Sequence, residues 1–142
     1  MATLRQLHFA ITDLRLHSNL DNNHGKNADE IRREIAQQTT VISPIQEDKF
    51  LCCFSHIFAG GYSAGYYSYK WAEVLSADAF SMFEEANLEN SQNIQLIGKK
   101  FKDTILSLGG SLSALEIYKL FRGREPKTDS LIRHLGLSNS KS

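Results

Sequence analysis

Cysteine is scarce in this chain, and its placement does not suit a metal clamp or a cross-link. The 142 residues contain 2 cysteines, Cys52 and Cys53, which are adjacent. Cysteines that bind zinc or staple small secreted domains normally form spaced pairs. We therefore expect both thiols to remain reduced and to have no structural role.

The chain also lacks an excess of either charge and a long apolar run. Its 16 Lys and Arg balance its 16 Asp and Glu, so no net field draws it toward nucleic acid or an anionic membrane. The opening residues MATLRQLHFAITDLRLH carry a polar side chain every few positions, which excludes the uninterrupted apolar stretch of a secretory signal or a membrane span. These absences predict a soluble, cytoplasmic protein that binds neither nucleic acid nor membrane.

No segment alternates between apolar and polar residues as a half-buried strand does. Apolar residues recur instead at helical spacing, beginning with Leu4, Leu7, Ile11 and Leu14, while Asp13 lies off that stripe. This first helix starts with no capping residue ahead of it, as though the sequence began partway into a structure. The length allows one domain with a real core. We expect an all-α fold.

Local signals place several helix ends. Asn27 with Glu30, and Ser113 with Glu116, have the spacing of a capping box. Pro44 should follow the end of the second helix, and Gly109–Gly110 should end a later one. A last short helix can be capped by Thr128 or Asp129 and stops before Gly136. The tail SNSKS, residues 138–142, is predicted to be disordered.

Residues 63–87 contain no proline and one glycine, and we interpret them as one long helix. Tyr62, Tyr66 and Tyr69 would project from one side of it and the core residues from the other. Tyrosines at this spacing are usually packing residues, so the pattern alone favours a core over a site. The preceding Gly60 and Gly61 predict either a pliable hinge or a close approach of two backbone segments.

The run FSHIFAGGYSAGYYSYKWAEVLSADAF, residues 54–80, closely resembles the substrate-loop segment of the oligopeptidase A and thimet oligopeptidase family. The resemblance extends through LRQLHFAITDLRLH, residues 4–17, and ILSLGGSLSALEIYKLFRGREP, residues 105–126. It implies that residues 1–137 are the C-terminal helical segment of the catalytic domain of a larger metallopeptidase that hydrolyses short peptides. The substrate loop would be residues 54–69.

The zinc-binding motif of that family is missing from this sequence. Family members hold zinc with two histidines of an HExxH helix and a downstream glutamate, which requires two rings on one helical face. The histidines of this chain include no pair spaced four apart: His8, His17, His24, His56 and His134. The resemblance thus implies zinc as the cofactor of the complete enzyme, with ligands outside this chain. If the enzyme is split, its missing N-terminal part would be a partner.

What the resemblance does assign to this chain is the other wall of the cleft. A neutral O–H aimed at growing negative charge stabilises the transition state more than the ground state. On the family pattern Tyr62 and Tyr69 are the catalytic donors to the oxyanion. The residues implied in substrate binding are His56, Gly60, Gly61 and Tyr66.

The other polar residues that could suggest a site are explained without catalysis or metal binding. An isolated Asp78 would be costly to bury, so a hydrogen bond or salt bridge is expected there, and FRGREP, residues 121–126, is interpreted as a corner that holds the last helix. His17, Asp21 and His24 lie in a turn-rich segment with no metal-binding spacing, and chance composition explains them. The alternative to a peptidase segment is a catalytically inactive peptide-binding module or a remnant without function.

Overall fold

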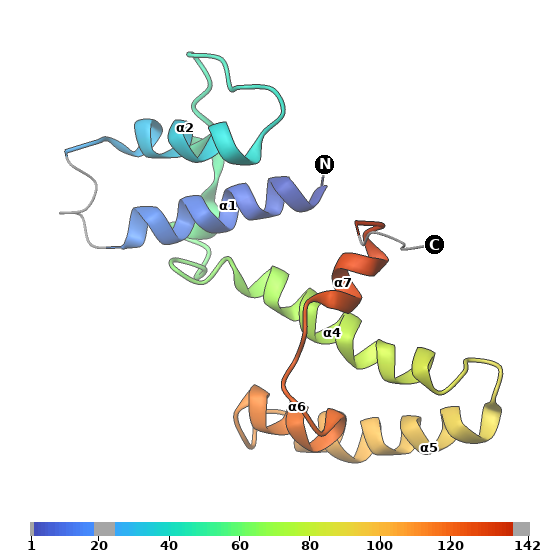
Figure 1. Cartoon of the computed structure of the whole chain (residues 1–142). Coiled ribbons are helices and arrows are strands. Elements are labelled where there is room, and N and C mark those ends of the chain that lie inside the picture. The colour runs from blue at the N-terminus through green and yellow to red at the C-terminus, as the bar shows by residue number, and fades with distance from the viewer. Residues whose placement is uncertain (1, 19–24, 138–142) are drawn as a thin grey trace. The chain divides into compact units, whose positions relative to one another are not determined.

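The computed structural model describes residues 2–18 and 25–137. Within them every regular element is helical and no strand occurs, which confirms the all-α prediction (Figure 1). The chain divides into two compact units, Met1–Lys70 and Trp71–Ser142. No helix of the described part is long and apolar enough to cross a membrane. The predicted disordered tail, Asp21 and His24 lie outside the described residues.

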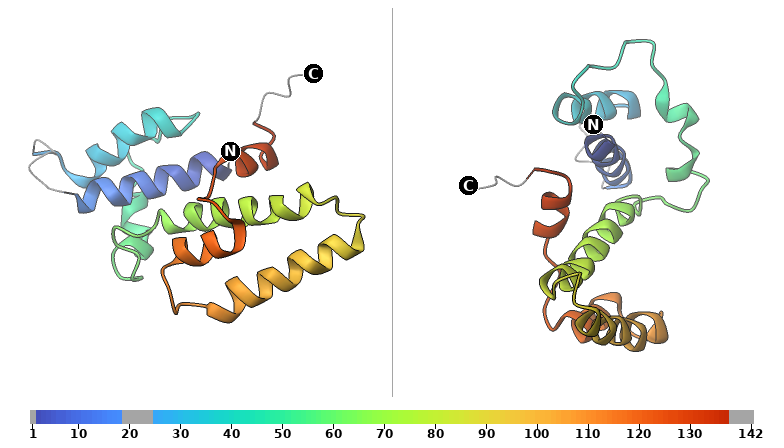
Figure 2. Two further views of the ribbon diagram at one scale, coloured as in Figure 1. Left: turned by 60° about the horizontal axis from the view of Figure 1, so that its bottom comes forward. Right: turned by 90° about the vertical axis from the view of Figure 1, so that its right-hand side faces the viewer.

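The first unit contains α1 (Ala2–His17), α2 (Ala28–Thr39), α3 (Phe50–Cys53) and the 3-10 turn η2 (Ser55–Ile57). α1 and α2 lie side by side in all the ribbon views (Figures 1 and 2). His8 and Thr39 join them by a buried side-chain hydrogen bond of 2.9 Å. The core of the unit is built from side chains of α1, α3, η2 and the loop after it: Phe9, Ala10, Leu51, Phe54, Ile57 and Tyr66.

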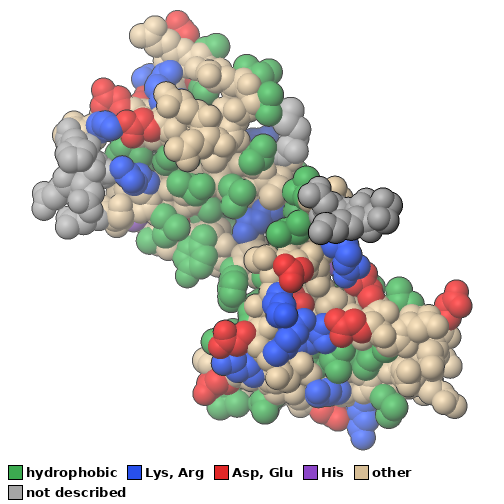
Figure 3. Space-filling view, viewed as in Figure 1, with side chains coloured by type: hydrophobic (Ala, Val, Ile, Leu, Met, Phe, Trp, Pro, Cys, Tyr) green, Lys and Arg blue, Asp and Glu red, His purple; other side chains and the backbone are tan. Residues whose placement is uncertain are grey.

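The buried face of α1 is not the predicted one. The stripe of Leu4, Leu7, Ile11 and Leu14 stays 37–43% exposed, and hydrophobic side chains gather over α1 on the face seen in Figure 3. The residues that the helix buries lie on the neighbouring face, and they include polar ones: His8, Phe9, Ala10, Thr12 and Asp13. The partners of that second face come from α2, from α3 and from the loop after η2, and this loop binds the buried aspartate.

Both predicted capping boxes are confirmed. Asn27 Oδ1 accepts from the Glu30 N–H at 3.0 Å, and a Glu30 carboxylate oxygen accepts from the Asn27 N–H at 2.8 Å. Ser113 and Glu116 exchange the equivalent bonds at 3.3 and 3.1 Å. Because these bonds satisfy amides that the first helical turn leaves free, each box fixes where its helix begins.

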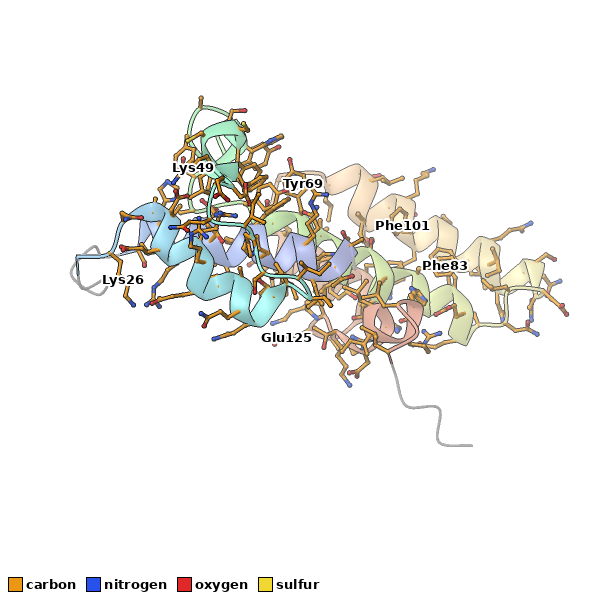
Figure 4. All side chains as sticks on the ribbon, turned by 90° about the horizontal axis from the view of Figure 1, so that it is seen from above. Lys26, Lys49, Tyr69, Phe83, Phe101 and Glu125 are labelled. Atoms are coloured by element: carbon orange, nitrogen blue, oxygen red, sulfur yellow. The ribbon has the colours of Figure 1, made fainter. Side chains whose placement is uncertain are left out.

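The second unit begins at Trp71, within α4 (Ser68–Glu85). Its other elements are α5 (Ser91–Phe101), the π-helical turn η3 (Lys102–Leu106), α6 (Ala114–Arg122) and α7 (Asp129–His134). Phe83 and Phe101 lie between α4 and α5 (Figure 4), and the Phe101 ring meets Phe121 of α6 edge-on at 5.4 Å. Thr128 is the residue before α7, but its side chain makes no capping bond.

Asp78 of α4 is 1% exposed and binds the segments that follow α5. It accepts from the Tyr118 hydroxyl at 2.6 Å, from Arg124 at 2.6 and 2.7 Å, and from the Lys127 N–H at 2.9 Å. Burial alone would raise the pKa of this carboxyl, but the bonds from Arg124, Tyr118 and Lys127 hold the pKa well below its usual range. Asp78 is therefore structural, and FRGREP is the predicted corner.

Candidate functional site

Four rings of the first unit gather into one group, which we call the aromatic cluster: His56, Tyr62, Tyr66 and Tyr69. The Tyr62 and Tyr69 rings stack with centroids 5.1 Å apart and planes at 27°. Tyr66 lies 5.0 Å from Tyr69, and His56 lies 6.1 Å from Tyr62 and 6.3 Å from Tyr66. The structure thus brings together all four of the side chains that the sequence proposed for catalysis or substrate binding.

The long helix predicted over residues 63–87 begins only at Ser68, so Tyr62 and Tyr66 lie on a loop and Tyr69 alone lies on α4. The predicted helix cannot run through Ala64, because its φ of +55° is a left-handed conformation that does not belong in a right-handed helix. The tyrosines therefore meet through a folded loop and not through helical spacing.

The two glycines shape that loop in different ways. A β-carbon on Gly60 would lie 2.8 Å from the Cα of His56, so the backbone can pass there only without a side chain. Gly61 has φ +78°, and the next amide, that of Tyr62, donates to the His56 carbonyl at 3.2 Å. The structure shows the predicted close approach at Gly60, which returns Tyr62 to the side of His56. The hinge stays a prediction.

Tyr66 is the member of the cluster that also belongs to the hydrophobic core. It is 9% exposed, it meets the Phe54 ring nearly edge-on at 5.2 Å, and its hydroxyl donates to Gln6 Oε1 at 3.1 Å. This hydroxyl is thus engaged by α1, and the ring packs against the Tyr69 ring. A substrate-binding role for Tyr66 stays a prediction.

Tyr62 and Tyr69, in contrast, reach the surface, with 36% and 40% of their area exposed. Figure 4 shows Tyr69 at the beginning of α4. A side-chain hydrogen bond with Tyr62 raises the pKa of Tyr69, because that bond favours the neutral phenol. Tyrosine is already a neutral O–H donor at physiological pH, since its ordinary pKa is about 10, and this shift extends that range upward for Tyr69.

A residue that the sequence did not single out holds the loop in place. Asp13 of α1 is fully buried, and its two carboxylate oxygens accept from the Ala64 and Tyr66 N–H groups, each at 2.9 Å. These contacts join residues 51 and 53 positions apart in the sequence, so no local motif predicts them. In the sequence Asp13 stands out only as a residue off the apolar stripe of α1.

Within residues 2–18 and 25–137 no three His, Cys, Asp or Glu side chains gather closely enough to hold a metal ion. His56 is the one histidine of the aromatic cluster, and its neighbours there are phenols. The donors present therefore do not fit the zinc centre that the resemblance implies for a complete enzyme.

Comparison with known proteins agrees with the resemblance. Residues 1–137 match Peptidase family M3. The chain is 53% identical over 135 residues to the probable cytosolic oligopeptidase A of Arabidopsis thaliana, an alignment that covers 95% of this chain and 19% of that protein. It is 48% identical over 139 residues to oligopeptidase A of Haemophilus influenzae, covering 98% of this chain and 20% of that protein.

More distant relatives match over the same region. Saccharolysin of Saccharomyces cerevisiae is 35% identical over 138 residues, 96% of this chain and 19% of that protein. The chain thus spans about one fifth of the length of the curated relatives it matches. Because the family match covers nearly all of the sequence, the chain belongs to Peptidase family M3.

Proposed function

We propose that the aromatic cluster is part of the substrate-facing wall of a peptide hydrolase that cuts short peptides. In this proposal Tyr62 and Tyr69 donate hydrogen bonds to the carbonyl oxygen of the scissile peptide as it becomes negative. The observation that carries it is the stacked, exposed Tyr62–Tyr69 pair in a member of Peptidase family M3.

The chemistry of the pair suits this role. Tyr69 is neutral at physiological pH, because the pKa of tyrosine is ordinarily about 10 and the bond with Tyr62 raises it further. A neutral donor gains most when charge grows on its acceptor. Removing one preorganised donor of this kind typically costs about 2.7–4 kcal/mol of barrier. His56 and the exposed backbone at Gly60 and Gly61 lie next to the pair and would bind the peptide on either side of the bond that is cut.

The metal belongs to another part of the enzyme in this proposal. Since the described residues provide no metal site, the zinc of the complete enzyme and its ligands would come from the part of the family's length that this chain does not span. The residues of this chain then act on the substrate directly, by orienting it and by donating hydrogen bonds.

A cytoplasmic location is also a proposal. The name of one relative describes a probable cytosolic enzyme, and a second, 52% identical over 135 residues, is named as chloroplastic and mitochondrial. Cell fractionation with an antibody to this chain distinguishes the two, because an organellar enzyme would sediment with membrane-enclosed compartments.

The catalytic proposal is tested in a chimera in which residues 1–137 replace the matching segment of the Arabidopsis cytosolic relative. Hydrolysis of a fluorogenic short peptide is measured for Tyr62→Phe and Tyr69→Phe. Each is expected to lower kcat by about 10²–10³ with little change in KM, because the lost bond forms fully only in the transition state. Tyr67→Phe is the matched control, since Tyr67 is 49% exposed and belongs to the same loop but not to the cluster.

The alternative, an inactive peptide-binding module, predicts a different pattern. Peptide binding to the 142-residue chain would weaken in the Tyr62→Phe/Tyr69→Phe double variant, while kcat of the chimera would not change in either single variant. Unchanged kcat in both phenylalanine variants contradicts the catalytic proposal.

A further inference from the structure

Asp13 is a buried carboxylate whose hydrogen-bond partners are backbone amides of the loop before α4. Burying a charged group is costly unless hydrogen bonds replace its water. Here the replacement comes from the loop: one oxygen binds the Ala64 amide and the other binds the Tyr66 amide, both at 2.9 Å. Both oxygens of a fully buried side chain on α1 are thus engaged by the backbone between Tyr62 and Tyr69.

The backbone that Asp13 holds is in an unfavourable conformation. Ala64 has φ +55°, and a residue with a β-carbon keeps this conformation only where its surroundings impose it. Asp13 binds on both sides of Gly65, and the Ser63 hydroxyl adds a bond of 2.7 Å to the Ile57 carbonyl. The loop is therefore braced at the point where its chain direction reverses.

Movement of this segment would carry both exposed phenols with it. The Tyr62 carbonyl accepts from the Gly65 N–H at 2.8 Å, which ties Tyr62 to the braced turn. The Tyr66 ring lies 5.0 Å from the Tyr69 ring, so Tyr66 supports Tyr69 from the other side. Asp13 thus has a continuous path of contacts to each member of the stacked pair.

We propose that Asp13 is a positioning residue for the aromatic cluster, whose carboxylate sets the placement of the Tyr62 and Tyr69 hydroxyls through the backbone of residues 64–66. His17, one helical turn further along α1, assists it: its Nδ1 lies 2.9 Å from Asp13 Oδ1 and 2.9 Å from the Asp13 carbonyl. The anchoring is a property of the fold, and its catalytic consequence rests on the proposed function.

The anchoring is tested in the 142-residue chain by amide hydrogen exchange. Asp13→Asn keeps the shape of the side chain but removes its charge and replaces one acceptor with an amino group. Protection of the Ala64 or Tyr66 amide is expected to fall by about 10- to 100-fold, the usual effect of losing a hydrogen bond to a charged group. Ala36→Gly, which weakens α2 in the same unit without touching the loop, is the control for general destabilisation.

Two results would overturn the anchoring. One is equal loss of Ala64 and Tyr66 protection in Asp13→Asn and Ala36→Gly. The other needs no variant: if neither amide is protected in the wild-type chain, Asp13 does not hold them.

The catalytic consequence is tested in the chimera by a double-mutant cycle. Asp13→Asn is expected to lower kcat by about 10- to 100-fold, the effect of a small misplacement of reacting groups, and to have little further effect in the Tyr62→Phe/Tyr69→Phe background. An equal loss of kcat in both backgrounds shows that Asp13 acts elsewhere and defeats this inference. If the tyrosine variants themselves leave kcat unchanged, the proposed function fails, and the exchange result still decides the anchoring.

Discussion

The Cα of His56 lies 2.8 Å from the point that a β-carbon on Gly60 would occupy, with the His56 carbonyl oxygen at 2.9 Å. Both atoms belong to the backbone of a 3-10 turn, which cannot move aside as a flexible side chain can. The glycine is therefore required by the close approach of two backbone segments beneath the aromatic cluster.

Gly60→Ala is expected to destabilise the first unit by about 1–3 kcal/mol, the usual effect of forcing an extra carbon into packed structure. Denaturant unfolding followed by tyrosine fluorescence measures it. Gly98→Ala is the control, because a β-carbon there meets nothing within 4 Å, and it should stabilise α5 by about 0.5–1 kcal/mol. Equal stability of Gly60→Ala and the wild type would contradict the close approach.

Tyr62→Phe should lower the pKa of Tyr69 toward the ordinary value of tyrosine. In the wild type the bond with Tyr62 raises that pKa by favouring the neutral phenol, and phenylalanine cannot make the bond. Absorbance titration of the phenolate band, with the other tyrosines assigned by single substitutions, measures the change. Tyr67→Phe should leave the Tyr69 titration where it is, and a Tyr69 pKa that is the same in all three proteins would show that the hydroxyls do not interact.

The helix ends that the sequence predicted correctly are those with local causes. Asn27 and Glu30 lie three residues apart, and the same spacing relates Ser113 to Glu116, so each box can be identified from four residues. The beginning of α4 has no such local cause. It depends on the left-handed Ala64, which in turn is held by Asp13, and no pattern within residues 63–87 contains that information.

The resemblance of residues 54–80 to the family's substrate loop identifies the candidate site, whereas the helical periodicity of the tyrosines does not. Helical spacing placed Tyr62, Tyr66 and Tyr69 on one face of a helix, whereas they meet because a loop folds back at Gly60. The apolar stripe of α1 likewise indicated the wrong buried face, because its residues stay 37–43% exposed. The role of Asp13 cannot be predicted from local sequence, because its partners are 51 and 53 residues away.

Asp78→Asn should destabilise the second unit by about 3 kcal/mol at pH 7. Removing one member of a buried ion pair typically costs about 3–5 kcal/mol, and the lower end applies because the Arg124 side chain is 32% exposed and can be hydrated. Since the folded-state pKa of Asp78 lies below its unfolded value, the stabilisation is complete above about pH 4 and is lost as pH falls further. Urea unfolding at a series of pH values measures it.

The difference in stability between the wild type and Asp78→Asn should therefore shrink below about pH 4. Glu125→Gln is the matched control, because Glu125 pairs with Lys119 on the surface and its side chain is 68% exposed. Such exposed pairs contribute little to stability because water screens them. A difference for Asp78→Asn that does not vary with pH would mean that the carboxylate is not the stabilising form.

His8 should make the first unit sensitive to mild acid. Burial lowers the pKa of this ring, and the nearby Arg32 lowers it further, against a smaller opposing effect of Asp48. A histidine whose folded-state pKa is depressed contributes stability above its unfolded pKa of about 6.5 and loses it as pH falls toward the folded value. Wild-type stability should then decline below pH 6.5 by up to about 1.4 kcal/mol per pH unit from this group.

His8→Gln isolates that contribution, because glutamine does not titrate and can still form a hydrogen bond with Thr39, which His8 reaches at 2.9 Å. The variant should lose less stability than the wild type between pH 7 and pH 5, as measured by urea unfolding at fixed ionic strength. His134→Gln serves as the control, because it replaces a partly exposed histidine of the second unit and leaves His8 and its surroundings unchanged. If the His8→Gln and wild-type profiles run parallel, the His8 ring accepts a proton in the folded protein as readily as in the unfolded chain. Burial on α1 would then not lower the pKa of His8.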